Sequence, residues 1–282
     1  MLVTLNDVLP RAKAEHYAVG LFNTVNLEMA KGVIAAAEEL RAPLIIGTAE
    51  ILTPYASLED LSEFLIPMAK KASVPIVIHF DHGLTLDMVK KAIRLGFTSV
   101  MYDCSTDDYY SNMGRVRCLV QYAHERGVTV EGELGHVGAN ESSAENHGPN
   151  DNSIYTDPAQ AKEYAEATGV DALAVAIGTA HGAYKAKPKL DFDRLETIAG
   201  MVKTPLVLHG GSGLSDDDFR KSIAKGIAKV NIFTDINTAF ARTATEMYKP
   251  GMGQTDLMPV VMKAVKEATM EKMQLFGCAG RY

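Results

Sequence analysis

Pro75-Ile-Val-Ile-His79-Phe-Asp81-His82-Gly83 is a run of apolar and β-branched residues that ends abruptly in an acid, an imidazole and a glycine. A strand that is apolar along its whole length is typical of a parallel sheet with helices on both faces. Charged groups at the last positions of such a strand would be costly to bury unless they take part in chemistry. The run therefore predicts a parallel α/β fold with a functional site at the carboxyl end of this strand.

Outside this run, the chain alternates between strand-like and helix-like segments. Eight strand–helix units can be counted, and eight parallel repeats are typical of a closed (β/α)8 TIM barrel. No G-x-G-x-x-G follows the first strand, which disfavours a dinucleotide-binding sheet. We therefore expect a single α/β barrel domain over residues 1–282, with an N-terminal helix and an extra C-terminal helix over residues 257–276. The expected strands span residues 18–23, 43–48, 75–83, 99–103, 128–135, 171–178, 205–213 and 227–233.

The composition is that of an ordinary soluble protein, with 47% hydrophobic and 22% charged residues in a chain of 282. The net charge of −7 argues against a nucleic-acid or anionic-membrane partner. No apolar stretch reaches the roughly 18 residues that span a bilayer, and the N-terminus lacks the features of a signal peptide. Three cysteines (Cys104, Cys118 and Cys278) without C-x-x-C spacing argue against a disulfide framework, so we expect a reduced, cytoplasmic protein.

A barrel places its chemistry at the carboxyl ends of its strands, and in this chain those ends are polar. The opposite ends carry mostly proline, small residues, valine and isoleucine. A long irregular stretch over residues 139–156 follows the fifth strand, and loops of this length are typical of lids or binding loops. This one-sided distribution predicts an active site at the barrel mouth. The polar residues at the strand ends are Asn23, Thr48, Asp81, His82, Asp103, Ser105, Glu133, His136, His181, His209 and Asn231.

Three histidines, His82, His181 and His209, stand directly after strand-like runs and next to glycine. Any one of them alone would more often be structural, but three at one barrel mouth are typical of an open catalytic zinc site. Cobalt, iron or manganese would also accept imidazole ligands. Asp103 and Glu133 would either form a second, harder metal position or orient the histidines.

The glycine-rich run His209-Gly-Gly-Ser-Gly213 and the segment from Asn231 to Thr234 predict an anion site. Backbone N–H groups of a glycine turn and of a helix N-terminus bind phosphate without basic side chains, and barrels recurrently bind phosphate after their last two strands. The alternative is that these glycines only permit tight turns. A metal beside a phosphate pocket suits a phosphorylated carbonyl compound, because the metal polarises the carbonyl while an α-proton leaves.

Two carboxylates are candidates for proton transfer in such a reaction. Asp81, next to a candidate ligand, would pass a proton to and from a substrate oxygen, or would only support that ligand. Glu141, at the base of the long loop, would remove the α-proton, or would be an ordinary exposed acid. His79 lies two residues before Asp81 on the same strand face, and we expect it to be a hydrogen-bonded interior histidine rather than a ligand.

The chain carries a set of motifs that is highly specific as a whole: Phe22-Asn23, Asp81-His82-Gly83, Glu131-Gly-Glu133-Leu-Gly135, His181-Gly182-Ala-Tyr184-Lys185, His209-Gly-Gly-Ser-Gly213, Asn231 and Leu275-Phe-Gly-Cys-Ala-Gly280. With these motifs the chain resembles, nearly end to end, the class II metal-dependent ketose-bisphosphate aldolases, such as fructose- and tagatose-bisphosphate aldolases. The resemblance implies reversible cleavage of a ketose 1,6-bisphosphate to dihydroxyacetone phosphate and an aldehyde such as glyceraldehyde 3-phosphate. It also implies a homodimer or homotetramer.

The resemblance implies roles for single residues as well. One catalytic zinc ion per chain would be bound by His82, His181 and His209, with Na⁺ or K⁺ near the substrate phosphate. Asp81 would donate the proton to the aldehyde-derived oxygen, and Glu141 would take the proton from dihydroxyacetone phosphate. The implied substrate contacts are Asn23, Thr48, Gly182, Gly210, Gly211, Ser212, Asn231, Ile232, Phe233 and Thr234.

Two departures from the family's usual pattern bear on which aldehyde is accepted. The family usually reads Gly-x-Glu-Asp where this chain has Ala139-Asn-Glu-Ser142, and it often carries an acid where Phe233 stands. The sugar therefore stays open among fructose, tagatose and a less common sugar phosphate. Two alternatives to the metal-dependent enzyme are a Schiff-base aldolase that uses Lys229, which is in phase with Asn231, and a non-catalytic barrel subunit that supports a partner enzyme.

Overall fold

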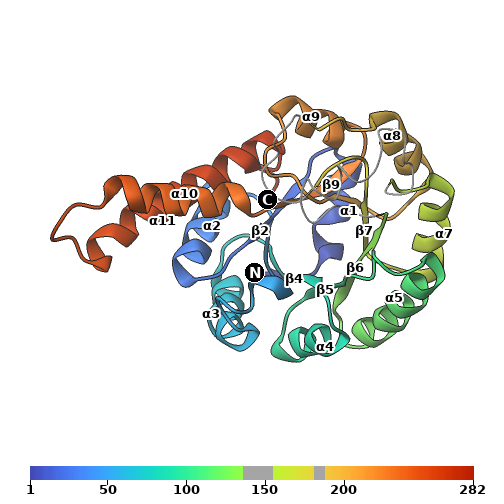
Figure 1. Ribbon diagram of the computed structural model, residues 1–282, viewed down its shortest axis with the longest axis horizontal. Coiled ribbons are helices and arrows are strands. Elements are labelled where there is room, and N and C mark those ends of the chain that lie inside the picture. Colours follow the sequence, from blue (N-terminus) through green and yellow to red (C-terminus); the bar gives the residue numbers. More distant parts are fainter. Residues whose placement is uncertain (136–154, 181–187) are drawn as a thin grey trace.

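The barrel expected from the sequence is the fold that the structure shows. The computed structural model describes residues 1–135, 155–180 and 188–282, and its strands form one parallel sheet in the order β1-β4-β3-β2-β9-β8-β7-β6-β5. Because β4 pairs with both β3 and β5, the strands from β2 to β9 close into a barrel, which Figure 1 shows inside a ring of helices. The strands are β1 (Leu2–Val3), β2 (Val19–Asn23), β3 (Leu44–Ala49), β4 (Ile76–Gly83), β5 (Ser99–Tyr102), β6 (Thr129–Leu134), β7 (Ala172–Val175), β8 (Leu206–Leu208) and β9 (Ile227–Ile232).

The helices around the barrel begin and end where the sequence supplies caps. Ser57 and Asp157 accept hydrogen bonds from backbone N–H groups in the first turns of α3 and α7, and Pro158 is the first residue of α7. Gly96 adopts the left-handed conformation directly after α4, with a φ of 96°. The helices are η1 (Leu5–Asp7), α1 (Leu9–Ala14), α2 (Leu27–Leu40), η2 (Glu50–Leu52), α3 (Leu58–Lys71), α4 (Leu86–Leu95), α5 (Tyr109–His124), α7 (Pro158–Thr168), α8 (Phe192–Met201), α9 (Asp216–Ala224), α10 (Thr234–Met247) and α11 (Gln254–Leu275).

The N-terminal segment covers the end of the barrel where the strands begin. Leu5 and Leu9 are fully buried, and the backbone N–H of Leu5 donates a hydrogen bond to Thr129 Oγ1 at the start of β6. Lys13 Nζ donates to the backbone carbonyls of residues 202–204, which precede β8. The carboxyl-terminal mouth is thus the end of the barrel that this segment leaves open.

Two strands are shorter than expected. The strand β7 ends at Val175 and β8 ends at Leu208, although the sequence predicted strands as far as residues 178 and 213. After β7 the backbone of Ala176 bonds to Thr156 and the carbonyl of Ile177 accepts from Asp191, so these groups do not pair with a strand. After β8, Gly210 (φ 64°) takes a left-handed conformation that regular strands do not have. The residues after β8, including His209, therefore lie in a loop at the barrel mouth.

The C-terminal helix is longer than expected and begins at Gln254 rather than at residue 257. Asp256 Oδ2 accepts a hydrogen bond from the backbone N–H of Gly253, which caps the helix one turn earlier than its apolar pattern indicated. The helix α11 packs against α10 and α2, and Figure 1 shows α10 and α11 projecting from the barrel as a helical hairpin. Within the described ranges, no helix is long and apolar enough to cross a membrane.

Candidate functional site

A cavity of about 660 Å³ opens at the carboxyl-terminal mouth of the barrel. Its polar side comes from the ends of β2 and β4 and from the loops that follow β5, β8 and β9, and its other side is apolar. The cavity is thus built from strand ends that are far apart in the sequence but meet at one end of the barrel. Of the site residues expected from the sequence, Asn23, Asp81, His82, Asp103, Ser105, Gly210, Gly211, Ser212, Asn231, Ile232, Phe233 and Thr234 line the cavity.

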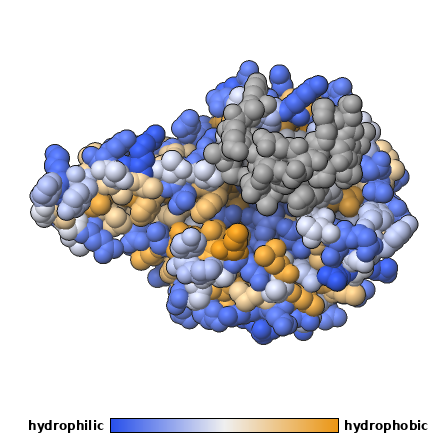
Figure 2. Space-filling view, viewed as in Figure 1, coloured by the Kyte–Doolittle hydropathy of each residue, from blue (hydrophilic) through white to orange (hydrophobic). Residues whose placement is uncertain are grey.

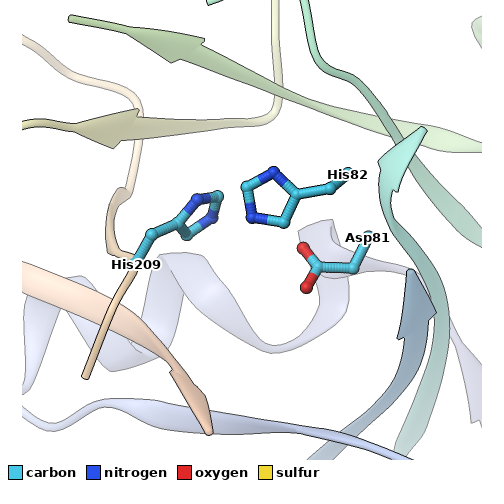
Figure 3. A group of neighbouring side chains, drawn as sticks. All are labelled: Asp81, His82 and His209. Atoms are coloured by element: carbon cyan, nitrogen blue, oxygen red, sulfur yellow. The ribbon is translucent and has the colours of Figure 1, made fainter. Parts of the chain in front are cut away.

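The end of β4 turns two successive side chains toward the mouth. In a regular strand Asp81 and His82 would point to opposite faces, but the pairing of β4 with β5 shifts register just before Gly83, and His82 has a φ of 41°. A left-handed conformation is strained for a residue with a Cβ, and such strain is typical of functional sites. Gly83 permits the turn, because a Cβ there would lie 2.7 Å from the carbonyl oxygen of Met101. Figure 3 shows Asp81 and His82 facing His209.

Asp103, directly after β5, orients His82. Its Oδ2 lies 2.7 Å from His82 Nδ1, and its Oδ1 accepts hydrogen bonds from the backbone N–H and the hydroxyl of Ser105. Because an ionised carboxylate only accepts hydrogen bonds, His82 Nδ1 carries the hydrogen and Nε2 is the nitrogen with ligand chemistry. Burial alone would lower the pKa of His82, but the charge of Asp81 and the hydrogen bond to Asp103 raise it.

His209, directly after β8, lies between two buried carboxylates of β6. Its Nε2 is 2.8 Å from Glu131 Oε1, and its Nδ1 is 2.9 Å from Glu133 Oε2. Burial alone would lower the pKa of this imidazole, but the hydrogen bonds to the two carboxylates raise it to about 10. The ring lies edge-on to that of His82, with 4.6 Å between the centroids. The two carboxylates therefore hold the imidazole in one orientation beside His82.

Two amides hold the carboxylate of Asp81. Asn23 Nδ2 donates a hydrogen bond of 2.8 Å to Oδ2, and Asn231 Nδ2 lies 3.0 Å from Oδ1 and 3.2 Å from Oδ2. Burial would raise the pKa of Asp81, but the positive charges of His82 and then of Lys229 lower it. The side chain is therefore an ionised acceptor whose position is defined before any substrate binds.

A second layer of polar side chains lies deeper in the barrel, two residues earlier on β4, β6 and β9. His79 Nδ1 is 2.8 Å from Ser99 Oγ, and Lys229 Nζ is 2.8 Å from Glu131 Oε2. Burial first, and then the charge of Lys229, lower the pKa of His79 to about 4, which describes a neutral interior histidine.

From the sequence no role was expected for Glu131, and Lys229 was expected only as a Schiff-base candidate. The signal that could have found this deeper layer is the two-residue spacing that recurs on three strands, from His79 to Asp81, from Glu131 to Glu133 and from Lys229 to Asn231. Each pair places one polar side chain at the mouth and another directly beneath it.

The donor set at the mouth fits a divalent metal ion. Ligand atoms of Asp81, His82 and His209 lie within 4.8 Å of one another, and so do those of His82, Asp103 and Glu133. Imidazole nitrogens backed by carboxylates are typical zinc ligands, and His209 Nδ1 lies 2.9 Å from the carboxylate oxygen Oε2 of Glu133. Both alternatives for Asp103 and Glu133, a second metal position or support of the histidines, are compatible with this geometry.

The loop after β8 and the start of α10 form the polar floor beside these donors. Residues 210–212 and 231–234 line the cavity, and Thr234 is the first residue of α10. A Cβ at Gly210 would collide with the carbonyl oxygen of Ala180, so glycine is required for this close approach. Backbone N–H groups at a glycine turn and at a helix N-terminus are typical of phosphate sites.

Several residues with predicted roles lie outside the described residues. They are Glu141, the candidate base; His181, the candidate third ligand; Gly182, a candidate phosphate contact; and His136, which the sequence left undecided. Their roles stay predictions.

Thr48 is away from the cavity, although the resemblance implied a substrate contact there. It is fully buried and pairs in register with Phe80, whose ring packs edge-on against Phe97, so both side chains face the helices. The next residue, Ala49, pairs with Asp81 and lines the cavity instead. The two-residue period of the strand is the reason, because it turns neighbouring side chains to opposite faces.

The apolar side of the cavity was not foreseen from the sequence. Ile51, Leu52, Tyr55 and Leu84 line it, and Ile51 and Tyr55 are 74% and 77% exposed. Figure 2 shows hydrophobic side chains gathered near the centre of one face of the molecule. These residues follow β3 and β4 in short irregular or 3₁₀ segments. Such segments have no regular hydrophobic repeat, so the sequence does not indicate which way their side chains point. The cavity is therefore lined by exposed apolar side chains as well as by the polar strand ends.

Comparison with known proteins relates the chain to aldolases along its whole length. The family described as fructose-bisphosphate aldolase class II matches residues 3–281. YdjI of Escherichia coli K12 is 42% identical over 275 residues, which cover 96% of this chain and 95% of YdjI. The fructose-bisphosphate aldolase of Thermus caldophilus is 39% identical over 314 aligned positions that cover both chains completely.

Solved structures agree with this relation. The crystal structure of the YdjI aldolase from Escherichia coli K12 matches with a TM-score of 0.90 and 39% identity, covering 100% of this chain and 99% of that one. A fructose-bisphosphate aldolase from Campylobacter jejuni has a TM-score of 0.82 at 22% identity, covering 100% and 97% of the two chains, and supports the fold alone.

Replacement of Asp103 by alanine tests the support of His82. Asp103→Ala removes the acceptor of His82 Nδ1–H, so the ring loses its fixed orientation, and we expect affinity for zinc to fall by about 10- to 100-fold. Competition with a chromophoric chelator measures this change. Asp87→Ala, which removes an exposed acid of α4, is the control. Unchanged zinc affinity in Asp103→Ala would contradict the role of Asp103.

Proposed function

The chain belongs to the class II fructose-bisphosphate aldolase family, and from this premise we propose that it is a metal-dependent aldolase. It reversibly cleaves a ketose phosphate into dihydroxyacetone phosphate and an aldehyde. The observation that carries the proposal is the convergence of His82, His209 and the carboxylate of Asp81 beside a glycine turn at the mouth. Such a reaction needs an electrophile for a carbonyl, a proton acceptor and an anion site, and the cavity offers groups suited to each.

We assign the metal to His82 and His209, together with His181, which lies outside the described residues. Zinc is the cation that a set of three imidazoles favours. When bound, it supplies a Lewis acid that polarises the substrate carbonyl and stabilises the charge that develops on the oxygen. Asp103 and Glu131 keep the two described imidazoles oriented.

Proton transfer is assigned to two carboxylates. Asp81 accepts the proton of the substrate hydroxyl as the carbon–carbon bond breaks, and it returns that proton in the direction of synthesis. The amides of Asn23 and Asn231 hold this carboxylate in the same place for both directions. Glu141, outside the described residues, is assigned the α-proton of dihydroxyacetone phosphate from the family resemblance.

The triose phosphate is assigned to the floor of the cavity. The backbone N–H groups of residues 210–212 and the N-terminal turn of α10, which begins at Thr234, offer a dense set of donors. The family resemblance adds Gly182 and a Na⁺ or K⁺ ion beside the phosphate. The predicted homodimer or homotetramer and the cytoplasmic location also stay proposals that rest on the resemblance and on the composition.

Two substrate classes are candidates. The relative named fructose-bisphosphate aldolase supports a ketose 1,6-bisphosphate, fructose or tagatose, with glyceraldehyde 3-phosphate as the aldehyde product. The apolar wall of Ile51, Leu52, Tyr55 and Leu84 favours a second candidate, another sugar phosphate whose distal end carries less charge. A phosphate that binds against an apolar wall loses its hydrogen bonds to water and finds no donor to replace them, which costs free energy.

Metal removal separates this mechanism from a Schiff-base aldolase. Incubation with a chelator should abolish cleavage, and added zinc should restore it, because the metal is the Lewis acid that polarises the substrate carbonyl. Borohydride added with substrate should leave the protein mass unchanged, since Lys229 Nζ is engaged by Glu131 and Asn231. Activity that survives the chelator together with a mass increase after borohydride would overturn the metal assignment.

A substrate panel decides the aldehyde. The purified chain with zinc is supplied with fructose, tagatose and sorbose 1,6-bisphosphates and with ketose 1-phosphates of different chain length, and release of dihydroxyacetone phosphate is measured. We expect turnover without any partner protein. The highest kcat/KM among the bisphosphates would favour the first substrate class, and among the 1-phosphates the second. Failure of the whole panel would support a non-catalytic barrel subunit.

Replacement of Asp81 by alanine separates its chemical role from a structural one. We expect Asp81→Ala to lower kcat by about 100-fold or more, the range of a lost proton-transfer group, while zinc content stays near one per chain. Metal analysis and steady-state kinetics measure the two quantities. Loss of the zinc together with the activity would mean that Asp81 is a scaffold of the metal site instead.

A further inference from the structure

Lys229 is a fully buried charged side chain at the centre of the barrel. It lies on β9, two residues before Asn231, and pairs in register with Val19 of β2. Taking an ammonium out of water is expensive unless the group is paired and hydrogen-bonded. The proposed proton and metal chemistry does not use Lys229, so its place in the site needs another account.

The ammonium touches the supports of two different reacting groups. Nζ lies 2.8 Å from Glu131 Oε2, and it donates a hydrogen bond of 2.7 Å to Asn231 Oδ1. Glu131 reaches His209 with its other oxygen, and Asn231 reaches Asp81 with its amide nitrogen. One cation therefore connects the metal side of the site with the proton-transfer side.

On the metal side, Lys229 defines which way the carboxylate of Glu131 faces. Oε2 is held by the ammonium, so Oε1 is the oxygen left for His209 Nε2, at 2.8 Å. Nε2 then carries the hydrogen, and Nδ1 is the nitrogen that faces Glu133 and the mouth. Lys229 therefore sets the orientation of the His209 ring indirectly, through Glu131.

On the proton-transfer side, Lys229 decides the direction of an amide. Asn231 Oδ1 accepts from Nζ, so Nδ2 is the end that faces the carboxylate of Asp81, 3.0 Å from Oδ1 and 3.2 Å from Oδ2. Without the ammonium, the amide would lose one of the two contacts that set its direction, and only its hydrogen bonds to Asp81 would disfavour the flipped form, which brings oxygen against oxygen. Asn23 would then be the one remaining amide that donates to Asp81 among the described residues.

A third observation concerns the deeper layer. Ligand atoms of His79, Asp81 and Glu131 also lie within 4.8 Å of one another, and this third group could also attract a cation. The ammonium of Lys229 already supplies positive charge to this cluster through Glu131. Its presence therefore favours the mouth, with His82 and His209, as the place for a divalent metal.

We propose that Lys229 is a positioning residue that orients both Glu131 beneath His209 and Asn231 beside Asp81, and so couples the metal site to the proton-transfer group. The proposal rests on the proposed function and deepens it, since it names a residue that touches neither substrate nor metal. It also gives the buried lysine a role that excludes a Schiff base, because its amine is engaged by two acceptors.

Lys229→Met tests the proposal, because methionine keeps most of the side-chain length and removes the charge. We expect zinc affinity, measured by chelator competition, to fall by about 10- to 100-fold, as for other residues that support metal ligands. The visible spectrum of the Co²⁺-loaded protein should change, and kcat should fall by a larger factor than KM rises, because the glycine turn of residues 210–212 is not in contact with the substituted side chain. Lys263→Met, which removes an exposed lysine of α11, is the matched control.

The double variant Lys229→Met/Glu131→Gln separates the effect on the metal side from the effect on the proton-transfer side. It also guards against failure to fold. Both buried charges disappear together, which is tolerated far better than the loss of one partner, and the glutamine carbonyl still accepts from His209 Nε2. We expect zinc affinity near the wild-type value with kcat still reduced, because the Asn231 amide has lost its guide.

Two results would overturn the proposal. The first is a folded Lys229→Met variant with wild-type zinc affinity, Co²⁺ spectrum and kcat. The second is a Lys229→Met variant that fails to fold while the double variant turns over at the wild-type kcat, since Lys229 would then only balance a charge. Wild-type protein that never cleaves a sugar phosphate would refute the proposed function instead, and the zinc and Co²⁺ measurements would still decide the role of Lys229.

Discussion

Charged groups inside a barrel must be paired with one another, and this constraint organises the whole site. Asp81, Glu131, Glu133, His209 and Lys229 are all nearly or completely buried, where an isolated charge costs several kcal/mol. Each of them is therefore engaged by a neighbouring donor or acceptor at hydrogen-bond distance. The pairing that makes burial tolerable also defines the directions of the imidazole and carboxylate groups. Preorganisation of the site is thus a consequence of where the charges lie.

The closed parallel sheet places the site residues at one end of the barrel, and one irregularity in β4 brings two of their side chains together. Parallel strands bring their carboxyl ends to one mouth, and the N-terminal segment covers the other end through Leu5 and Lys13. A regular β4 would still send Asp81 and His82 to opposite faces. The bulge before Gly83 and the left-handed His82 turn both side chains to the same side. Backbone strain at this point is stored where the site needs it.

The two sides of the cavity differ in chemistry. Residues 210–212 and the start of α10 offer backbone donors next to the imidazoles, whereas Ile51 and Tyr55 present an apolar surface. The match to the family covers residues 3–281. The second side is made by segments directly after β3 and β4, where loops vary without disturbing the barrel. Within one family, this is a natural place for differences in the aldehyde that is accepted.

The sequence by itself determined the barrel, the eight strands that close it and the end at which the polar residues collect, but it did not reveal the short strand β1 (Leu2–Val3) that pairs with β4. Apolar runs, caps such as Ser57 and Asp157, and polar residues placed after strands are local signals, so they can be read without coordinates. The sequence also pointed to His82, His209 and Asp81 through their positions after strands and through a family resemblance.

Only the tertiary structure decided which of these residues contact one another, and which hydrogen bonds and ion pairs connect them. In the sequence Thr48 resembles the other polar residues at strand ends, but its side chain faces the helices, because it pairs in register with Phe80. Lys229 was a nucleophile candidate until Glu131, almost a hundred positions away, proved to be its partner. Register, bulges and charge pairing across the barrel join residues that are distant along the chain, and a single sequence carries no measure of those distances.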